Sequence, residues 1–143
     1  MGFLERFQFH FWDGMEMIGS LINKWDPVDC KTEKAYEKSL YNFLHEELED
    51  IQVTRQYVTG RIRADLVVGD KVIIELKNNL DTTSKYQRLI GQLTNYRDWD
   101  GSVLLVLMGT TESNLRKQLD QYLDNEGLTG GYMKSDAVIV IEK

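Results

Sequence analysis

Apolar side chains follow two spacings along the 143-residue chain, and the two spacings predict different secondary structure. Four stretches carry apolar residues every three or four positions, which is typical of amphipathic helices. These predicted helices lie near residues 15–25, 31–49, 83–98 and 112–125. Alternating or continuous apolar runs predict five strands. The predicted strands lie near residues 51–58, 61–68, 72–78, 103–107 and 137–141.

The order of these elements indicates the fold class. After an N-terminal helical segment, the chain reads as one helix, three strands, a helix, a strand, a helix and a strand. Strands and helices in such an order form one sheet with helices packed on its faces. We therefore expect an α/β protein with a mixed β-sheet core flanked by helices, in the order αβββαβαβ. Thr32 or Asp29 is expected to cap the first helix of this core.

The single proline, Pro27, separates two parts of the chain. Residues 31–143 are expected to form the main domain, since this length suffices for one hydrophobic core. Residues 1–30 are expected to form an appendage rich in aromatic and large apolar residues. These are Phe3, Phe7, Phe9, Phe11, Trp12, Met15, Met17, Ile18 and Trp25. The appendage could pack on its own domain, but large apolar surfaces usually mark interfaces, so we expect a homodimer in which it serves as an arm.

The two strands predicted at 61–68 and 72–78 contain three charged residues that a hydrophobic hairpin does not need. These are Asp65, Glu75 and Lys77. Burying such groups is costly unless a partner neutralises them. A divalent metal ion and a phosphate group are suitable partners, so the segment predicts a site for both.

The length of the hairpin turn decides whether these charged side chains share a face. Opposed residues of an antiparallel pair lie on the same face. A three-residue turn, residues 69–71, would place Asp65 opposite Glu75 and Arg63 opposite Lys77. The usual two-residue turn would separate the carboxylates, so the chemistry favours the longer turn or a bulge. The other face would then be entirely apolar, with Ile62, Ala64, Leu66, Val68, Val72, Ile74 and Leu76.

The spacing Asp-x9-Glu-x-Lys, formed by Asp65, Glu75 and Lys77, resembles the core signature of the PD-(D/E)xK nuclease superfamily. Members of that superfamily hydrolyse phosphodiester bonds with magnesium. Ala64 stands where the eponymous proline would be, a position at which many members vary. The resemblance covers about residues 31–110 and implies a restriction-endonuclease-like fold.

The resemblance also implies roles for individual residues. Asp65, Glu75 and the backbone carbonyl of Leu76 would hold Mg²⁺ or Mn²⁺, and such hard oxygen ligands suit magnesium. Lys77 would orient or help deprotonate the attacking water. A helix glutamate often joins the site, and Glu37 lies just ahead of the buried stripe, as in the first helix of archaeal Holliday-junction resolvases. Glu37 would bind the metal-bound water or a second metal ion.

Three more helix residues are candidates on the same basis. Glu33, one turn before Glu37, is the second candidate acid. Gln92 and Tyr96 resemble the Gln-x-x-x-Tyr motif of the RecB-like exonuclease branch and share a helix face. Gln92 would touch the metal-bound water or the scissile phosphate. Tyr96 is as consistent with packing as with nucleic-acid contact.

The net charge of −6 by itself argues against a nucleic-acid partner, but the charges are unevenly distributed along the chain. Residues 55–97 contain eight Lys and Arg against four Asp and Glu, so the segment with the motif is locally positive. A positive segment favours a phosphate partner. We expect Arg88 to contact a neighbouring phosphate and Arg63 to contact nucleic acid as well, with DNA preferred to RNA.

Composition excludes several classes of protein. No apolar run approaches the roughly 20 residues of a membrane span, and residues 1–6 lack the features of a signal peptide. Cys30 is the only cysteine, which excludes an internal disulfide and a cysteine-based metal site. We therefore expect a cytoplasmic protein without a membrane partner.

Two functions from different classes remain in view. The first is a metal-dependent nuclease that carries the reaction on Asp65, Glu75 and Lys77. The alternative is a weakly active or inactive nuclease-fold module that binds nucleic acid or assists assembly. The intact Lys77 favours the nuclease, because a scaffold has no need of it. The sequence leaves open the form of the substrate, endo- or exonucleolytic cutting, sequence specificity and any need for a larger complex.

Overall fold

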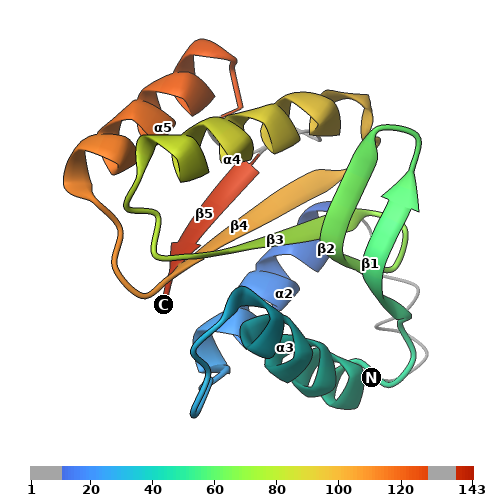
Figure 1. Cartoon of the computed structure of the whole chain (residues 1–143). Helices are drawn as coiled ribbons and strands as arrows, with labels where there is room; N and C mark the ends of the chain where they lie inside the picture. Colours follow the sequence, from blue (N-terminus) through green and yellow to red (C-terminus); the bar gives the residue numbers. More distant parts are fainter. Residues whose placement is uncertain (1–10, 129–137) are drawn as a thin grey trace.

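A mixed five-stranded sheet forms the centre of the computed structural model, which describes residues 11–128 and 138–143 (Figure 1). The strands are β1 (Val53–Thr59), β2 (Ile62–Val68), β3 (Val72–Asn78), β4 (Ser102–Met108) and β5 (Val138–Glu142). They lie side by side in sequence order. The pairs β1–β2 and β2–β3 are antiparallel, whereas β3–β4 and β4–β5 are parallel. The expected mixed α/β class is therefore confirmed.

Helices cover both faces of the sheet, as Figure 1 shows. The helices are α2 (Phe11–Lys24), α3 (Glu33–Glu47), α4 (Thr83–Asn95) and α5 (Ser113–Asn125). Buried residues of α2 and α3 form one core cluster with Leu104 and Val106, and those of α4 and α5 form a second with Val103 and Leu105. All seven residues of β4 are buried, because this central strand is covered on both sides.

Local sequence signals account for the helix boundaries. Thr32, and not Asp29, caps α3, because its hydroxyl accepts a hydrogen bond from the Ala35 N–H at 3.1 Å. The helix expected over 83–98 ends at Asn95 and continues as a short 3-10 turn, η1 (Tyr96–Asp98). These boundaries place the start of α4 directly after the motif strand β3.

The helix α2 packs against the same face of the sheet as α3. Met15, Ile18 and Ile22 are at most 1% exposed and lie in the same cluster as Leu40 and Leu44 of α3. This apolar stripe covers one face of the sheet, so α2 and the main domain share a core, while the expected domain boundary at residue 30 stays a prediction. The helix packs on its own domain, which was the alternative to the dimer arm, and the homodimer stays a prediction. Phe3, Phe7 and Phe9 lie outside the described residues.

The turn between β2 and β3 has the predicted three residues, since Val68 pairs with Val72. The expected single apolar face is wrong, however. Leu66 and Leu76 lie in the cluster beneath α2 and α3, whereas Ile62 and Ala64 lie in the cluster beneath α4 and α5. The even-numbered side chains of β2 therefore point to one face of the sheet before Asp65 and to the other face after it. The reversal coincides with an irregularity in the neighbouring strand, where Gln56, opposite Asp65, has a φ of 50°.

No helix within residues 11–128 and 138–143 is long and apolar enough to cross a membrane. The longest of the helices, α3, has 15 residues. A membrane-spanning helix needs about 20 apolar residues.

Candidate active site

The carboxylate of Asp65 lies where β2 and β3 stop pairing. Their regular register runs from Val68 and Val72 to Leu66 and Ile74. At the next position, Asp65 Oδ2 accepts the Leu76 N–H at 2.9 Å. The side chain therefore takes the place of a backbone acceptor and is fixed beside the Leu76 peptide.

Glu75 is the most deeply buried carboxylate of the site, with 1% of its surface exposed. Burial, followed by the negative charge of Asp65, raises the pKa of Glu75 to about 8. The Tyr96 hydroxyl and Lys77 favour the charged form and act in the opposite direction. The acid is therefore largely protonated near neutral pH unless a further positive charge is bound beside it.

Tyr96 links Glu75 to the backbone of β2. Its hydroxyl lies 2.5 Å from Glu75 Oε2 and 2.7 Å from the Arg63 carbonyl oxygen. One hydroxyl proton cannot serve both acceptors. A protonated Glu75 would donate to the Tyr96 oxygen, which would then donate to Arg63. Tyr96 offers little surface for the expected contact with nucleic acid, because the residue is 5% exposed and its hydroxyl is hydrogen-bonded inside the protein.

Lys77 completes the predicted set of three. Its Nζ lies 3.6 Å from Glu75 Oε1, and the residue is 9% exposed. Burial raises the pKa of Asp65, while the Leu76 N–H and the Lys77 charge lower it. The single ammonium group of Lys77 therefore acts on two carboxylates, Asp65 and Glu75, at a site largely shielded from solvent.

The helix acid Glu37 is held by the protein itself. It is 4% exposed, and Arg55 Nη2 donates to its Oε2 at 2.9 Å. The side-chain amide of Gln56 donates to its other oxygen. Glu37 lines one cavity with Asp65, but both of its oxygens already have hydrogen-bond partners.

Glu33, the second candidate acid, lies at the more open side. Its Oε1 accepts the Asn78 N–H at 3.0 Å, which ties the start of α3 to the end of β3. Glu33 lines two cavities, one with Asp65 and Glu37 and the other with Lys77. Glu33 therefore lies between the two cavities and lines both of them.

The remaining predicted residues lie at different distances from this centre. Arg88 lines the cavity that contains Lys77, as expected for a phosphate contact. Gln92 is half-buried, and its Oε1 is buried without a hydrogen-bond partner in the described part of the chain. The Arg63 side chain is exposed on β2, and the described register does not pair it with Lys77.

Three functional neighbours were not predicted from the sequence. Arg55 and Gln56 hold Glu37, and Lys85 lines the cavity with Lys77 and Arg88. Lys85 precedes Arg88 by three residues, and this helical spacing could have revealed it. No sequence signal marks Gln56, because its role depends on a left-handed backbone conformation in a strand.

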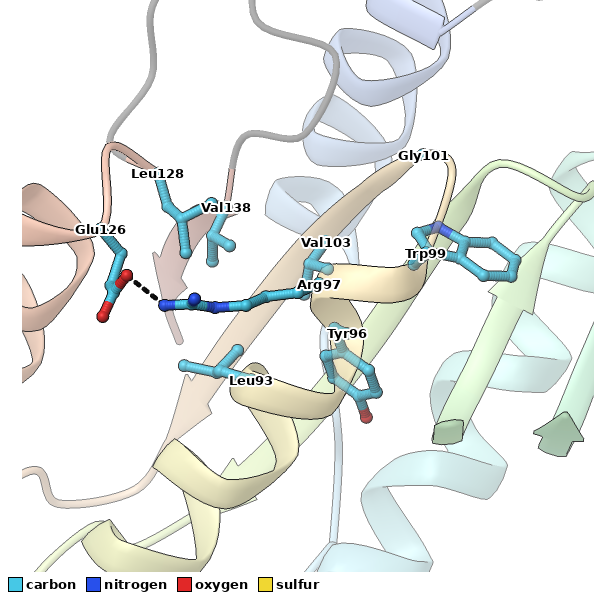
Figure 2. A pocket seen from close by; sticks show the side chains of 9 residues that line it. All are labelled: Leu93, Tyr96, Arg97, Trp99, Gly101, Val103, Glu126, Leu128 and Val138. Atoms are coloured by element: carbon cyan, nitrogen blue, oxygen red, sulfur yellow. Dashed lines mark ion pairs between the residues drawn. The ribbon is translucent and has the colours of Figure 1, made fainter. Parts of the chain in front are cut away.

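A further cavity, of about 260 Å³, lies at the far end of α4 (Figure 2). Leu93, Val103 and Val138 are among its apolar walls, and Figure 2 shows Arg97 reaching across it to pair with Glu126. Its charged groups neutralise one another. The cavity therefore lacks the unbalanced carboxylates that distinguish the motif site.

The donor set of the motif site fits a divalent metal ion. The negative charge of Asp65 raises the pKa of Glu75, and Lys77 supplies only one positive charge. Hard oxygen donors of this kind suit Mg²⁺ or Mn²⁺. Within residues 11–128 and 138–143 no three His, Cys, Asp or Glu side chains form a ready metal cluster. A metal would need the Leu76 carbonyl, water or substrate oxygens besides the two acids.

Comparisons of the chain with protein-family models, with curated proteins and with solved structures find no match. The functional interpretation therefore depends on the residues of the site. Their types, burial and mutual contacts are the observations that any proposal must explain.

Proposed function

We propose that this protein is a metal-dependent nuclease with a restriction-endonuclease-like core that hydrolyses phosphodiester bonds in DNA in preference to RNA. One observation carries the proposal. Asp65, Glu75 and Lys77 converge at the point where two strands separate, with Asp65 bonded to the Leu76 N–H and Lys77 beside Glu75. An apolar core gains nothing from this costly arrangement, whereas a phosphodiesterase needs each of its members.

Asp65, Glu75 and the Leu76 carbonyl would hold Mg²⁺ or Mn²⁺. When bound, the metal would supply positive charge at the scissile phosphate and lower the pKa of water. Lys77 would orient the attacking water and offset negative charge on the phosphate. Tyr96 would keep the Glu75 carboxyl group in place, and Arg88 would bind phosphate.

Cleavage of nucleic acid with Mn²⁺ or Mg²⁺ tests the proposal. Purified protein is incubated with single-stranded, duplex and branched DNA and with single-stranded RNA. Asp65→Asn and Glu75→Gln should each lower the cleavage rate at least a hundredfold, because each removes an anionic oxygen donor. Asp70→Asn, in the exposed β2–β3 turn, is the matched control and should cut like the unmodified chain. Cleavage that survives Asp65→Asn and Glu75→Gln would place the chemistry elsewhere.

A second candidate function is a nucleic-acid-binding or assembly module without turnover. The full engagement of Glu37 by Arg55 and Gln56 favours it, since this acid is not free to assist a metal. Such a module would bind DNA but show no metal-dependent cleavage by the unmodified chain. The assay described above separates the two functions.

A further inference from the structure

A basic cavity of about 280 Å³ lies between the end of β3 and the start of α4. It is lined by Glu33, Lys77, Asn78, Leu80, Lys85 and Arg88. Its volume is below the roughly 300–1,000 Å³ of pockets that enclose drug-sized ligands. The cavity therefore suits a small charged group and its immediate surroundings.

The charges in this cavity are unbalanced. Three cationic residues face one acid, Glu33, across it. Lys77 is shared with Glu75 at 3.6 Å, and Lys85 Nζ is 3.0 Å from both Asp81 Oδ1 and the Asn79 carbonyl oxygen. Arg88 has no ion-pair partner within residues 11–128 and 138–143, and a guanidinium group without a partner is ready to bind an oxyanion.

The helix that carries these cations reinforces the imbalance. The helix α4 begins at Thr83, and its first turn contains no acidic residue. Its positive N-terminal end is therefore uncompensated by a carboxylate within that turn. Lys85 and Arg88 are three residues apart and both line the cavity.

The neighbouring cavity beyond Glu33 has the opposite character. It is lined by three acids and two cations, namely Glu33, Glu37, Asp65, Lys34 and Arg55. An anion is therefore attracted to the α4 side of Glu33 and repelled from the α3 side. This difference in charge favours one orientation of a bound polyanion across the site, with its negative groups on the α4 side.

We infer that the cavity beside α4 is a binding subsite for a second phosphate group of the substrate strand, held by Arg88 and Lys85. The inference rests on the proposed nuclease function and extends it. The subsite determines on which side of the cut bond the strand is bound, because the acids on the α3 side outnumber its cations. The bound group is either an internal phosphodiester or the terminal phosphate of a strand end.

Binding of a thymidine dinucleotide tests the subsite without any cleavage. Three forms are compared, with a 5′-phosphate, with a 3′-phosphate and with neither, in the presence of a chelator and at low salt. Changes in the backbone amide NMR signals of residues 83–88 report the binding. Arg88→Ala and Lys85→Ala should each weaken binding about tenfold, as expected for loss of a charge-assisted hydrogen bond. Arg88→Lys should recover part of the loss.

Lys117→Ala is the matched control, because Lys117 is an exposed cation on α5 that lines neither cavity of the site. It should bind like the unmodified chain. Equal binding of the three dinucleotides identifies an internal phosphodiester, and tighter binding of one phosphorylated form identifies a strand end. Affinity that is indifferent to both Arg88→Ala and Lys85→Ala, or unshifted signals at residues 83–88, would overturn the inference.

The two proposals fail in different ways. Dinucleotide binding that depends on Arg88 without any cleavage of nucleic acid would support the subsite and contradict the nuclease. Cleavage that depends on Asp65 and Glu75, together with binding that ignores Arg88 and Lys85, would do the reverse. Circular dichroism of each variant checks that the fold is retained.

Discussion

Proton binding by Glu75 changes the net charge of the candidate metal site. Its carboxyl group is surrounded by protein, and Asp65 adds a second negative charge nearby. Protons and a divalent cation therefore compete for the same oxygen atoms. The affinity for Mn²⁺ should rise with pH until Glu75 is fully ionised.

This coupling predicts how stability changes with pH in the absence of metal. The pKa of Glu75 rises from its ordinary value of 4.5 to about 8 in the folded chain, so between these values the folded state holds more protons than the unfolded state. The free energy of unfolding should therefore fall as the pH rises from 5 to 8. Urea denaturation with a chelator measures it. Glu75→Gln should lack the part of this fall that Glu75 causes, and equal slopes for both chains would contradict the assignment.

Tyr96 is expected to be a positioning residue for Glu75. Tyr96→Phe removes a hydrogen bond that favours ionised Glu75 and leaves the Arg63 carbonyl without this donor. The variant should lose about 1–3 kcal/mol of stability, because a buried acceptor loses its partner. The midpoint of the pH dependence of Mn²⁺ binding should also move upward. A loss of stability without that shift would assign Tyr96 a packing role only, and Tyr86→Phe, on the half-buried Tyr86 of α4, is the control.

At the scale of elements, α2 shows why an aromatic N-terminal segment is hard to interpret from sequence. Met15, Ile18, Ile22 and Trp25 form a predicted stripe, and the stripe is buried. The pattern establishes that the stripe needs a partner but does not identify the partner. Trp25 Nε1 donates to Ser39 Oγ at 3.0 Å, a contact within the chain that no periodicity could reveal.

The burial of α2 predicts a large effect of truncating one of its side chains. Ile22→Ala should lower the free energy of unfolding by about 2–5 kcal/mol, since it creates a cavity in the core. Ser20→Ala, at an exposed position of the same helix, should change it by less than about 0.5 kcal/mol. Denaturant titration at two protein concentrations measures both. A concentration-dependent midpoint would show that an intermolecular contact contributes, as the homodimer prediction requires.

In the β2–β3 hairpin the length of the turn could be predicted from the sequence, but the faces of its side chains could not. The parity argument for Asp65 and Glu75 favoured a three-residue turn or a bulge, because either brings the carboxylates to one face, and the turn has three residues. The same argument missed the reversal of faces around Asp65. That reversal occurs opposite Gln56, whose φ is 50°, and a non-glycine residue gives no sign of such a conformation in advance.

At the scale of the molecule, element order was predictable and the meeting of distant residues was not. Apolar spacing predicts helices and strands because burial enforces it. The basic and acidic cavities depend on α3, β3 and α4 meeting around Glu33, which hydrogen-bonds to Asn78 from 45 positions away. The local positive charge of residues 55–97 was visible in the sequence, but its concentration beside α4 requires the folded chain.

The left-handed residue Gln56 has a consequence for the behaviour of the protein at high concentration. The strand β1 is at an edge of the sheet, where free backbone groups can recruit strands from other molecules. Gln56 interrupts the seven-residue strand near its middle, so an incoming strand would find only short regular stretches on either side. We therefore expect the irregularity at Gln56, which donates to Glu37, to protect this edge against aggregation as well.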